Sequence, residues 1–215
     1  MFDLQKYNMN NNNSIEEGYL EIILGPMFSG KTTHIIQQYN TYKYIGKNIA
    51  VINYIEDIRY NDFAPSNFAD KENILSTHDK IMIPCIMLKD LNDAWYNKSN
   101  IYYDKLHNSD VILINEGQFF DNLYKIVLEM VEEQNKIVHI CGLDSDYKRD
   151  KFGEIVDLIP FCDKVTKLHS LCSNCKNGKK AIYSYRVSEE TVQIVIGNNN
   201  YVPLCRKCYI NNIQK

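Results

Sequence analysis

Short apolar runs recur along the first three quarters of the chain and predict the strands of a sheet. These runs are Tyr19–Leu24, Asn48–Asn53, Val111–Ile114 and Lys136–Cys141. Runs without polar and apolar alternation are typical of parallel strands that are buried on both faces. Residues 81–88 form either a further strand or an irregular connection.

Helical patterns occupy the intervals between these runs, at residues 31–44, 89–107 and 121–134. The last of them places Leu123, Ile126, Val127, Met130 and Val131 on one helical face. Residues 57–80 are polar and predict a loop. Alternating strands and helices predict an α/β fold, a parallel sheet with helices on both faces.

Three segments directly follow strand ends in this scheme: Gly25, Asn115–Glu116 and Leu143–Asp144. Ligands of open α/β sheets bind beyond the carboxyl ends of the strands. We therefore expect the three segments to converge on one site.

The pattern changes after about Pro160, where the chain becomes strand-like, rich in turns and rich in cysteine. We predict three parts: a polar, Asn-rich tail over 1–15, an α/β domain over 16–162 and a small domain over 163–215. A polar tract such as Asn10–Asn13 buries too little surface to become ordered.

Composition and charge exclude several classes of protein. The 215 residues carry a formal net charge of -3, so no basic field points to nucleic acid as a partner. The chain has no apolar stretch of about 18 residues and no signal-peptide pattern, so we expect no membrane association. An odd number of cysteines, seven, without a signal predicts a reducing, cytoplasmic compartment rather than disulfides.

A phosphate-binding loop follows the first strand and precedes the first helix. It matches G-x-x-x-x-G-K-[ST] with Gly25, Pro26, Met27, Phe28, Ser29, Gly30, Lys31 and Thr32. The glycines let backbone N–H groups face phosphates at a helix N-terminus. Lys31 is expected to bind the β- and γ-phosphates of ATP, and the Thr32 hydroxyl to ligate Mg²⁺.

Glu116 is the candidate catalytic base. P-loop proteins carry an acidic group after an apolar strand, and here Asn115 comes first and Glu116 second. A carboxylate beside the γ-phosphate can accept a proton from an attacking hydroxyl. The alternative is that Glu116 only orients the water shell of Mg²⁺.

Two C-x-x-C pairs predict a structural metal site, with Cys172, Cys175, Cys205 and Cys208 as ligands. A Cys₄ set with this spacing is typical of Zn²⁺, and its closed coordination leaves no position for catalysis. The site would fasten residues 176–204, a candidate lid over an acceptor substrate. Aromatic residues for stacking on a planar base are Phe119, Phe120, Tyr147, Phe152 and Tyr201.

These motifs together resemble the type II thymidine kinases, a zinc-containing family of cytosolic and viral enzymes. The resemblance covers about residues 18 to 210. Besides the P-loop it rests on Arg59-Tyr60, Thr77-His78-Asp79, Glu116-Gly117-Gln118-Phe119-Phe120, Leu143-Asp144, Lys164-Val165, Lys167-Leu168 and Cys205-Arg206-Lys207-Cys208-Tyr209.

The resemblance implies transfer of the γ-phosphate of ATP to the 5′-hydroxyl of thymidine or deoxyuridine, giving dTMP in nucleotide salvage for DNA synthesis. It implies a P-loop domain with a zinc-binding lasso domain, a homotetramer and feedback inhibition by dTTP.

The family's site residues carry over by position. Glu116 becomes the catalytic base, with Lys31 and Arg59 beside it; Asn115 and Gln118 join the P-loop in the ATP and Mg²⁺ site. The substrate-binding residues would be Phe119, Tyr147, Phe152, Val195, Ile196, Gly197 and Tyr201.

The chain departs from the family pattern at four places. Asn115 replaces the usual Asp, and Ser145-Asp146 replace the usual Gly-Thr. Tyr147 stands where Phe is common. The lasso is one residue shorter, with Gly197-Asn198 in place of Gly-Gly.

Two other functions remain open from the sequence. Asn115 would fit a catalytically weak homologue that binds nucleotide as a sensor or partner. A P-loop ATPase whose zinc ribbon contacts nucleic acid is disfavoured by the absence of a basic face.

Overall fold

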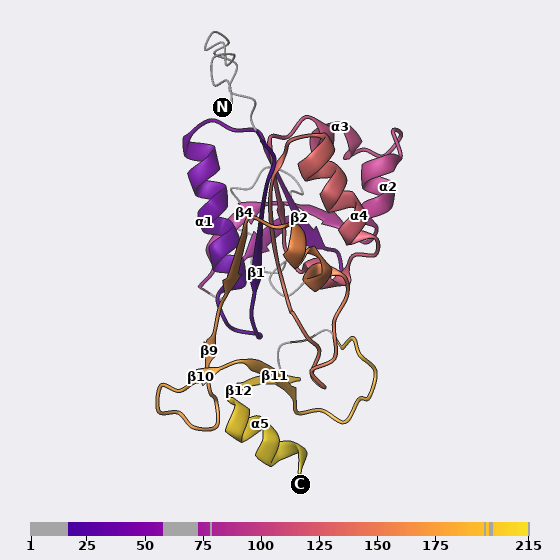
Figure 1. Cartoon of the computed structure of the whole chain (residues 1–215). Coiled ribbons are helices and arrows are strands. Elements are labelled where there is room, and N and C mark those ends of the chain that lie inside the picture. The colour runs from indigo at the N-terminus through magenta and orange to yellow at the C-terminus, as the bar shows by residue number, and fades with distance from the viewer. Residues whose placement is uncertain (1–16, 58–72, 78, 196, 198–199, 215) are drawn as a thin grey trace, which may run out of the picture.

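A parallel sheet of six strands forms the centre of the larger part of the protein (Figure 1). The computed structural model describes residues 17–57, 73–77, 79–195, 197 and 200–214. The predicted tail over 1–15, Arg59 and Ile196 lie outside the described residues. The strand order is β5-β2-β6-β7-β1-β8, and every neighbouring pair is parallel. The strands are β1 (Tyr19–Leu24), β2 (Ile49–Tyr54), β5 (Ile86–Leu88), β6 (Val111–Ile114), β7 (Ile137–Gly142) and β8 (Lys164–Lys167).

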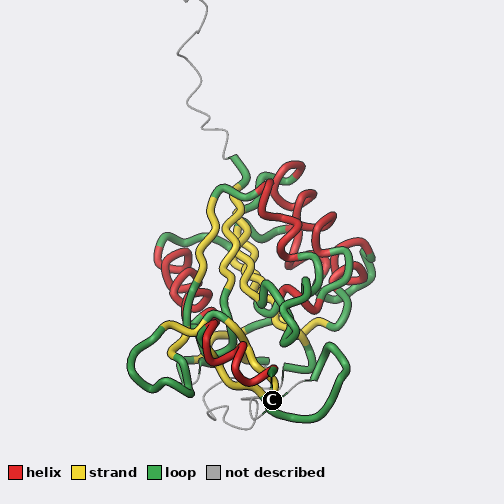
Figure 2. The backbone as a smooth tube through the Cα atoms, turned by 60° about the horizontal axis from the view of Figure 1, so that its bottom comes forward, coloured by secondary structure: helices red, strands yellow, loops and turns green. Residues whose placement is uncertain are grey.

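Helices cover both faces of the sheet, so the predicted α/β fold is confirmed (Figures 1 and 2). Successive strand residues point to opposite faces. Ile22 of β1 therefore packs on one face, while Ile23 packs on the other, with Ile35 of α1. The first face is covered by α2 (Leu91–Tyr96), α3 (Tyr103–His107), α4 (Leu123–Leu128), the π-helical turn η3 (Glu129–Glu133) and the 3₁₀ helix η4 (Ile155–Phe161), and the second by α1 (Lys31–Tyr44).

A small unit lies beyond the carboxyl end of β1 (Figure 1). It has its own buried cluster, which includes Ala181, Leu204 and Tyr209 and is separate from the two clusters of the sheet. It contains the paired strands β9 (Ser170–Leu171) and β10 (Lys180–Ala181), the paired strands β11 (Tyr183–Arg186) and β12 (Tyr201–Leu204), and α5 (Arg206–Ile213).

The small unit begins later than the expected boundary at residue 163. β8 pairs with β1 from Glu21↔Lys164 to Leu24↔Lys167 and is an edge strand of the large sheet. Its exposed lysines resemble the polar, turn-rich sequence that follows, which is why the sequence did not separate them.

Three predicted segments need correction. The loop expected over 57–80 contains β3 (Ile74–Ser76), which pairs antiparallel with β4 (Met82–Pro84); three residues are too few to show a periodicity. Residues 81–88 hold two strands, β4 and β5, rather than one.

The helix expected over 89–107 is two helices. The side chains of Asn97 and Asn100 accept hydrogen bonds from the N–H groups of Ser99 and Tyr102, and such local turns interrupt a helix. Across the described ranges, no helix is both long and apolar enough to cross a membrane.

A buried polar cluster lies between α1 and the sheet, centred on Glu21 of β1. Thr166 donates to Glu21 at 2.7 Å, and the ammonium of Lys164 lies 2.9 Å away. Nδ1 of His139 lies 3.2 Å from the same carboxylate without hydrogen-bond geometry, and Tyr42 contacts Nε2 at 3.0 Å. Burial raises the pKa of Glu21, but the contacts with Thr166 and Lys164 outweigh it, so this pKa lies below its usual value.

This cluster predicts an acid-sensitive stability. Burial lowers the pKa of His139 to about 4, against the attraction of Glu21. Between the ordinary value of 6.5 and about 4, the unfolded chain binds a proton that the folded protein does not. The free energy of unfolding should therefore fall by about 2 to 3 kcal/mol as the pH falls through this window.

Urea unfolding at pH 7 and pH 5 measures this effect. His139→Gln should flatten the pH dependence relative to wild type, and comparison of the two proteins cancels any acid loss of a bound metal. The exposed His169 is the matched control. His169→Gln should retain the wild-type dependence of the unfolding free energy on pH. Equal slopes for His139→Gln and wild type would refute the assignment.

Candidate active site

One of the cavities, of about 320 Å³, lies at the carboxyl ends of the strands. It joins the P-loop to the segments after β6 and β7 and to the small unit, so the expected convergence of strand ends is confirmed. The predicted site residues that line it are Met27, Phe28, Ser29, Gly30, Lys31, Thr32, Glu116, Gln118, Phe119, Tyr147, Phe152, Val195, Gly197 and Tyr201.

The P-loop has the geometry of a phosphate site. Gly30 precedes α1 with φ 88°, a left-handed conformation that glycine adopts without strain. The ammonium of Lys31 donates to the carbonyls of Gly25 and Pro26, each at 3.0 Å. The Ser29 hydroxyl is buried, and no hydrogen bond to another described group satisfies it. A buried hydroxyl and a buried ammonium at a helix N-terminus fit a phosphate.

Glu116 lies at the end of β6 in a left-handed conformation, with φ 55°. Nε2 of Gln118 donates to its carboxylate at 2.7 Å, and Oε1 of Gln118 accepts the N–H of Leu143 at 3.0 Å. Gln118 therefore fixes Glu116 against the end of β7. Gly153 makes room for this arrangement: it has φ 61°, and a Cβ there would lie 2.3 Å from the Gln118 carbonyl.

Asn115 does not line the cavity, and its side chain is buried in a chain of hydrogen bonds below it. Nδ2 donates to Asn53 at 2.8 Å, and Oδ1 accepts from the thiol of Cys141 at 2.9 Å. Asn115 is 1% exposed, and Asn53 is equally buried. A neutral amide suits this position because an ionised carboxylate would need a charged partner there.

Aromatic side chains form one wall of the cavity. Phe119 stacks on Tyr54 with 4.8 Å between ring centroids and meets Phe152 edge-on at 5.4 Å. Phe120 instead points into the core and is 2% exposed. Of the two phenylalanines after Glu116, only Phe119 is available to a ligand in the cavity.

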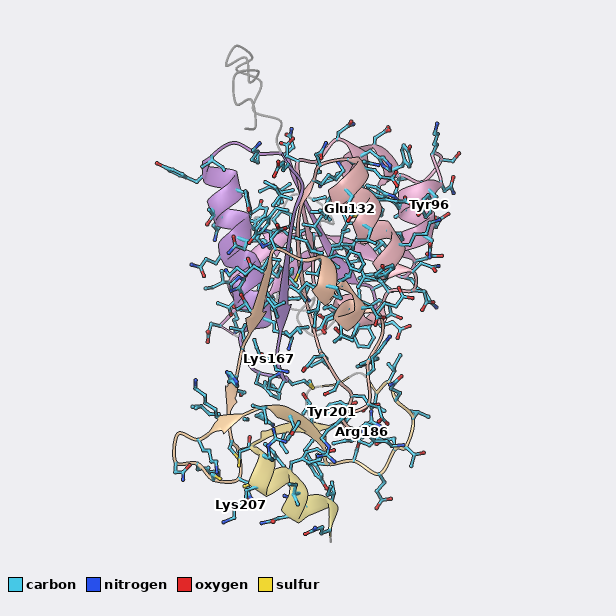
Figure 3. All side chains as sticks on the ribbon, viewed as in Figure 1. Tyr96, Glu132, Lys167, Arg186, Tyr201 and Lys207 are labelled. Carbon is cyan, nitrogen blue, oxygen red and sulfur yellow. The ribbon has the colours of Figure 1, made fainter. Side chains whose placement is uncertain are left out.

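The small unit closes the cavity on the other side. Oγ of Ser184 accepts the N–H of Met27 in the P-loop at 2.9 Å. The Tyr201 hydroxyl donates to the carbonyl of Val195 at 3.1 Å. In Figure 3, Tyr201 and Arg186 lie in the part of the small unit that faces the sheet.

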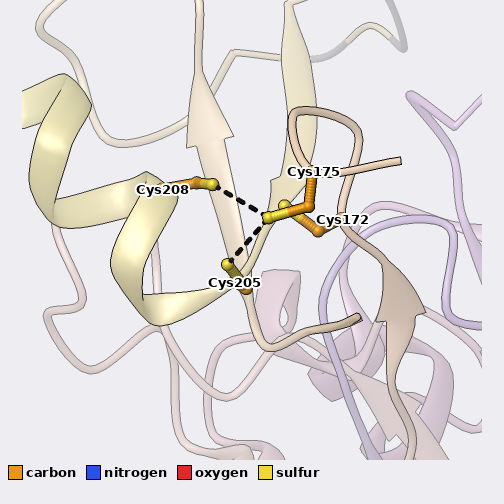
Figure 4. Close-up of side chains that lie close together, drawn as sticks. All are labelled: Cys172, Cys175, Cys205 and Cys208. Carbon is orange, nitrogen blue, oxygen red and sulfur yellow. Dashed lines mark hydrogen bonds between the residues drawn. The ribbon is translucent and has the colours of Figure 1, made fainter. Parts of the chain in front are cut away.

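The four predicted cysteine ligands lie together between the β9 turn and the start of α5 (Figure 4). All four sulfur atoms are within 4.8 Å of one another. Cys175 is 3.7 Å from Cys205 and 3.3 Å from Cys208, measured between sulfurs. Tetrahedral Zn²⁺ with bonds of about 2.3 Å requires sulfurs about 3.8 Å apart, so the cluster is compatible with a structural zinc site.

Ser145 and Asp146, noted in the sequence as a departure from the family pattern, line the cavity. Several other cavity residues were not predicted as site residues: Asp57, Ser76, Thr77, Asp79, Ser184, Gln193 and Ile194. Most are small polar residues on strand ends or in loops, where no motif marks them. Only Thr77 and Asp79 belong to a segment that had already supported the resemblance.

Comparison with known proteins agrees with this geometry. The family model described as "Thymidine kinase" matches residues 18–209. The chain is 37% identical over 196 residues to thymidine kinase a of Arabidopsis thaliana, covering 91% of this chain and 76% of the plant protein. It is 35% identical to the thymidine kinase of Sheeppox virus and 34% identical to that of Vaccinia virus, with 91% of this chain and 98% of each viral protein covered. The match spans the sheet, the cavity and the cysteine cluster, and the chain therefore belongs to the thymidine kinase family.

Proposed function

We propose that the protein is an ATP-dependent thymidine kinase that transfers the γ-phosphate to the 5′-hydroxyl and yields dTMP for nucleotide salvage. The observation that carries this function is the cavity itself. It holds a P-loop, a fixed carboxylate and an aromatic wall within one space. Phosphoryl transfer needs mainly positioning and charge stabilisation, and this arrangement supplies both.

Lys31 and Thr32 serve the phosphates in this proposal. The Lys31 ammonium exchanges the carbonyls of Gly25 and Pro26 for the β- and γ-phosphates of ATP. The Thr32 hydroxyl would hold Mg²⁺, which neutralises charge on the transferred phosphoryl group. Glu116, held by Gln118, accepts the proton of the 5′-hydroxyl.

The nucleoside lies against the aromatic wall and beneath the small unit. Phe119 and Phe152 offer ring faces and edges to a planar base, and Val195 and Gly197 supply backbone groups. We propose Zn²⁺ in the cysteine cluster as the ion that holds the small unit in this position. Arg59 remains a proposed charge-stabilising residue on family grounds.

The catalytically weak homologue had Asn115 as its only support. The buried hydrogen bonds of Asn115 with Asn53 and Cys141 give this residue a structural role, so its presence does not favour a weak homologue. We therefore retain the kinase as the proposed function.

Feedback by dTTP, a homotetramer and a cytoplasmic location are further proposals drawn from the family resemblance. The cavity joins the base wall to the P-loop, so one thymidine nucleotide with a phosphate chain would occupy both subsites. Inhibition by dTTP should weaken as the concentration of thymidine or of ATP is raised.

The proposed homotetramer is tested separately. Light scattering after gel filtration measures the oligomeric state.

A phosphate-transfer assay with ATP against thymidine, deoxyuridine, deoxycytidine and deoxyguanosine tests the function. We expect thymidine to give the highest kcat/KM, with deoxyuridine lower by about 10- to 200-fold at most, because it lacks one methyl group. Absence of transfer to any pyrimidine deoxynucleoside by zinc-replete protein would refute the proposal.

A further inference from the structure

Contacts between the small unit and the loop after β7 gather at two residues that depart from the family pattern, Asp146 and Tyr147. The Tyr147 hydroxyl donates to the carbonyl of Thr191 at 2.9 Å. Nε2 of Gln193 donates to Oδ2 of Asp146 at 3.0 Å. Both bonds tie residues 187–195, here called the covering segment, to the edge of the cavity.

Asp146 is a rigid partner for this contact. It is 7% exposed, and its Oδ1 accepts the N–H groups of Lys148 and Asp150 at 2.8 and 2.9 Å. One carboxylate oxygen therefore holds the turn over 146–150, and the other holds the covering segment. Such a double role orients the side chain without help from a ligand.

Arg186 holds the covering segment from the inside. Its guanidinium is 3.8 Å from the centroid of the Tyr147 ring and is almost fully buried. It donates to the backbone carbonyls of Glu190 at 2.9 Å, of Gln193 at 2.8 Å and of Val192. The guanidinium thus supplies these three carbonyls with hydrogen bonds, as a neighbouring strand would do in a sheet.

We propose that Asp146, Tyr147, Arg186, Thr191 and Gln193 form a latch that positions the covering segment before the nucleoside binds. This inference rests on the proposed function for the identity of the nucleoside. Val195, two residues beyond Gln193, lines the cavity. Because the latch orders the segment in the free protein, the nucleoside does not bear that ordering cost, and its affinity rises. Asp146 and Gln193 are positioning residues, which set nucleoside affinity rather than ATP affinity.

In the hydrogen bond between Gln193 and Asp146, the donor and the acceptor can be exchanged by mutation, and this exchange tests the latch. Gln193→Glu places two carboxylates against each other and should raise the Kd for thymidine about five- to tenfold. Asp146→Asn alone should give a Kd between those of wild type and Gln193→Glu, because the Gln193 amide can turn over and accept instead, but then loses its 3.4 Å contact with the Lys151 carbonyl. In the double variant the amide introduced at position 146 would donate to the carboxylate introduced at position 193. The Kd should then return to within about twofold of wild type.

The measurements are thymidine binding by calorimetry, KM for ATP and hydrogen exchange of the amides over 187–195 in the unliganded protein. Gln193→Glu should speed this exchange and the double variant should restore it, while KM for ATP changes by less than about twofold. Asp150→Asn, an exposed charge change in the same turn, is the matched control.

Unchanged exchange and unchanged thymidine affinity in Gln193→Glu would overturn the latch, as would a double variant weaker than either single one. A wild-type protein that fails to phosphorylate thymidine would instead refute the proposed function. The exchange rates of the unliganded variants would still decide the latch in that case.

Discussion

Replacing Glu116 with glutamine is expected to lower kcat by about 10²- to 10⁴-fold, the usual contribution of a general base. The amide has nearly the same shape but cannot accept the proton of the 5′-hydroxyl at neutral pH. Gln118, which donates to Glu116 at 2.7 Å, can still donate to the amide oxygen, so the local structure should persist. Rapid-quench or steady-state phosphate transfer to thymidine measures the effect.

Binding separates catalysis from misfolding in this experiment. The Kd values of ATP and thymidine should stay within about threefold of wild type, since the glutamine keeps the side chain's volume. Glu132→Gln, an exposed change on η3 outside the cavity, serves as the matched control and should retain full turnover. Undiminished turnover in Glu116→Gln would refute the role of Glu116 as base. The alternative that Glu116 only orients the water shell of Mg²⁺ would then remain.

Loss of a cysteine ligand is expected to have the second large effect. Cys175→Ser should remove zinc and abolish thymidine phosphorylation, because the proposed ion would fasten the turn after β9 to α5. Apparent binding free energies of structural Zn²⁺ reach about 10 to 16 kcal/mol. The buried cluster of the small unit is itself built around the cysteines, so loss of the ion should also loosen the packing of Ala181 and Leu204. Metal analysis and far-UV circular dichroism on the purified variant measure both consequences.

Cys162 provides the control for this experiment. It is a free thiol outside the cluster, with its sulfur near the carbonyl of Ile159, and Cys162→Ser should keep zinc and activity. Full zinc in Cys175→Ser, or less than about half a zinc per chain in undamaged wild type, contradicts the Cys₄ assignment.

The sequence predicted those elements whose signal is local. β1 and β6 have the predicted bounds, since a short, mostly apolar run of four to six residues identifies a strand that is buried on both faces, even with Glu21 inside β1. The P-loop was equally readable, because its glycines and its lysine occupy fixed positions within eight residues. The cysteine pairs carried the same kind of information over a longer distance.

The remainder depends on contacts between distant segments. Nothing in the sequence around Lys164–Lys167 shows that these residues pair with β1, since an exposed edge strand looks like a polar turn region. Asn115 was read as a change at the metal site, because its partners Asn53 and Cys141 are far away in the chain. Asp146 was noted only as a departure from the family pattern, and its hydrogen bond to Gln193, 47 residues away, could not be predicted from either residue alone.

The position of β8 determines how the small unit can move. Its covalent connection to the sheet leaves β8 at Leu168, whose N–H donates to the carbonyl of Leu24, one residue before the P-loop. A displacement of the small unit would therefore begin next to the phosphate loop, and it would have to break the contacts of Tyr147 with Thr191 and of Asp146 with Gln193 before a path for the nucleoside opened.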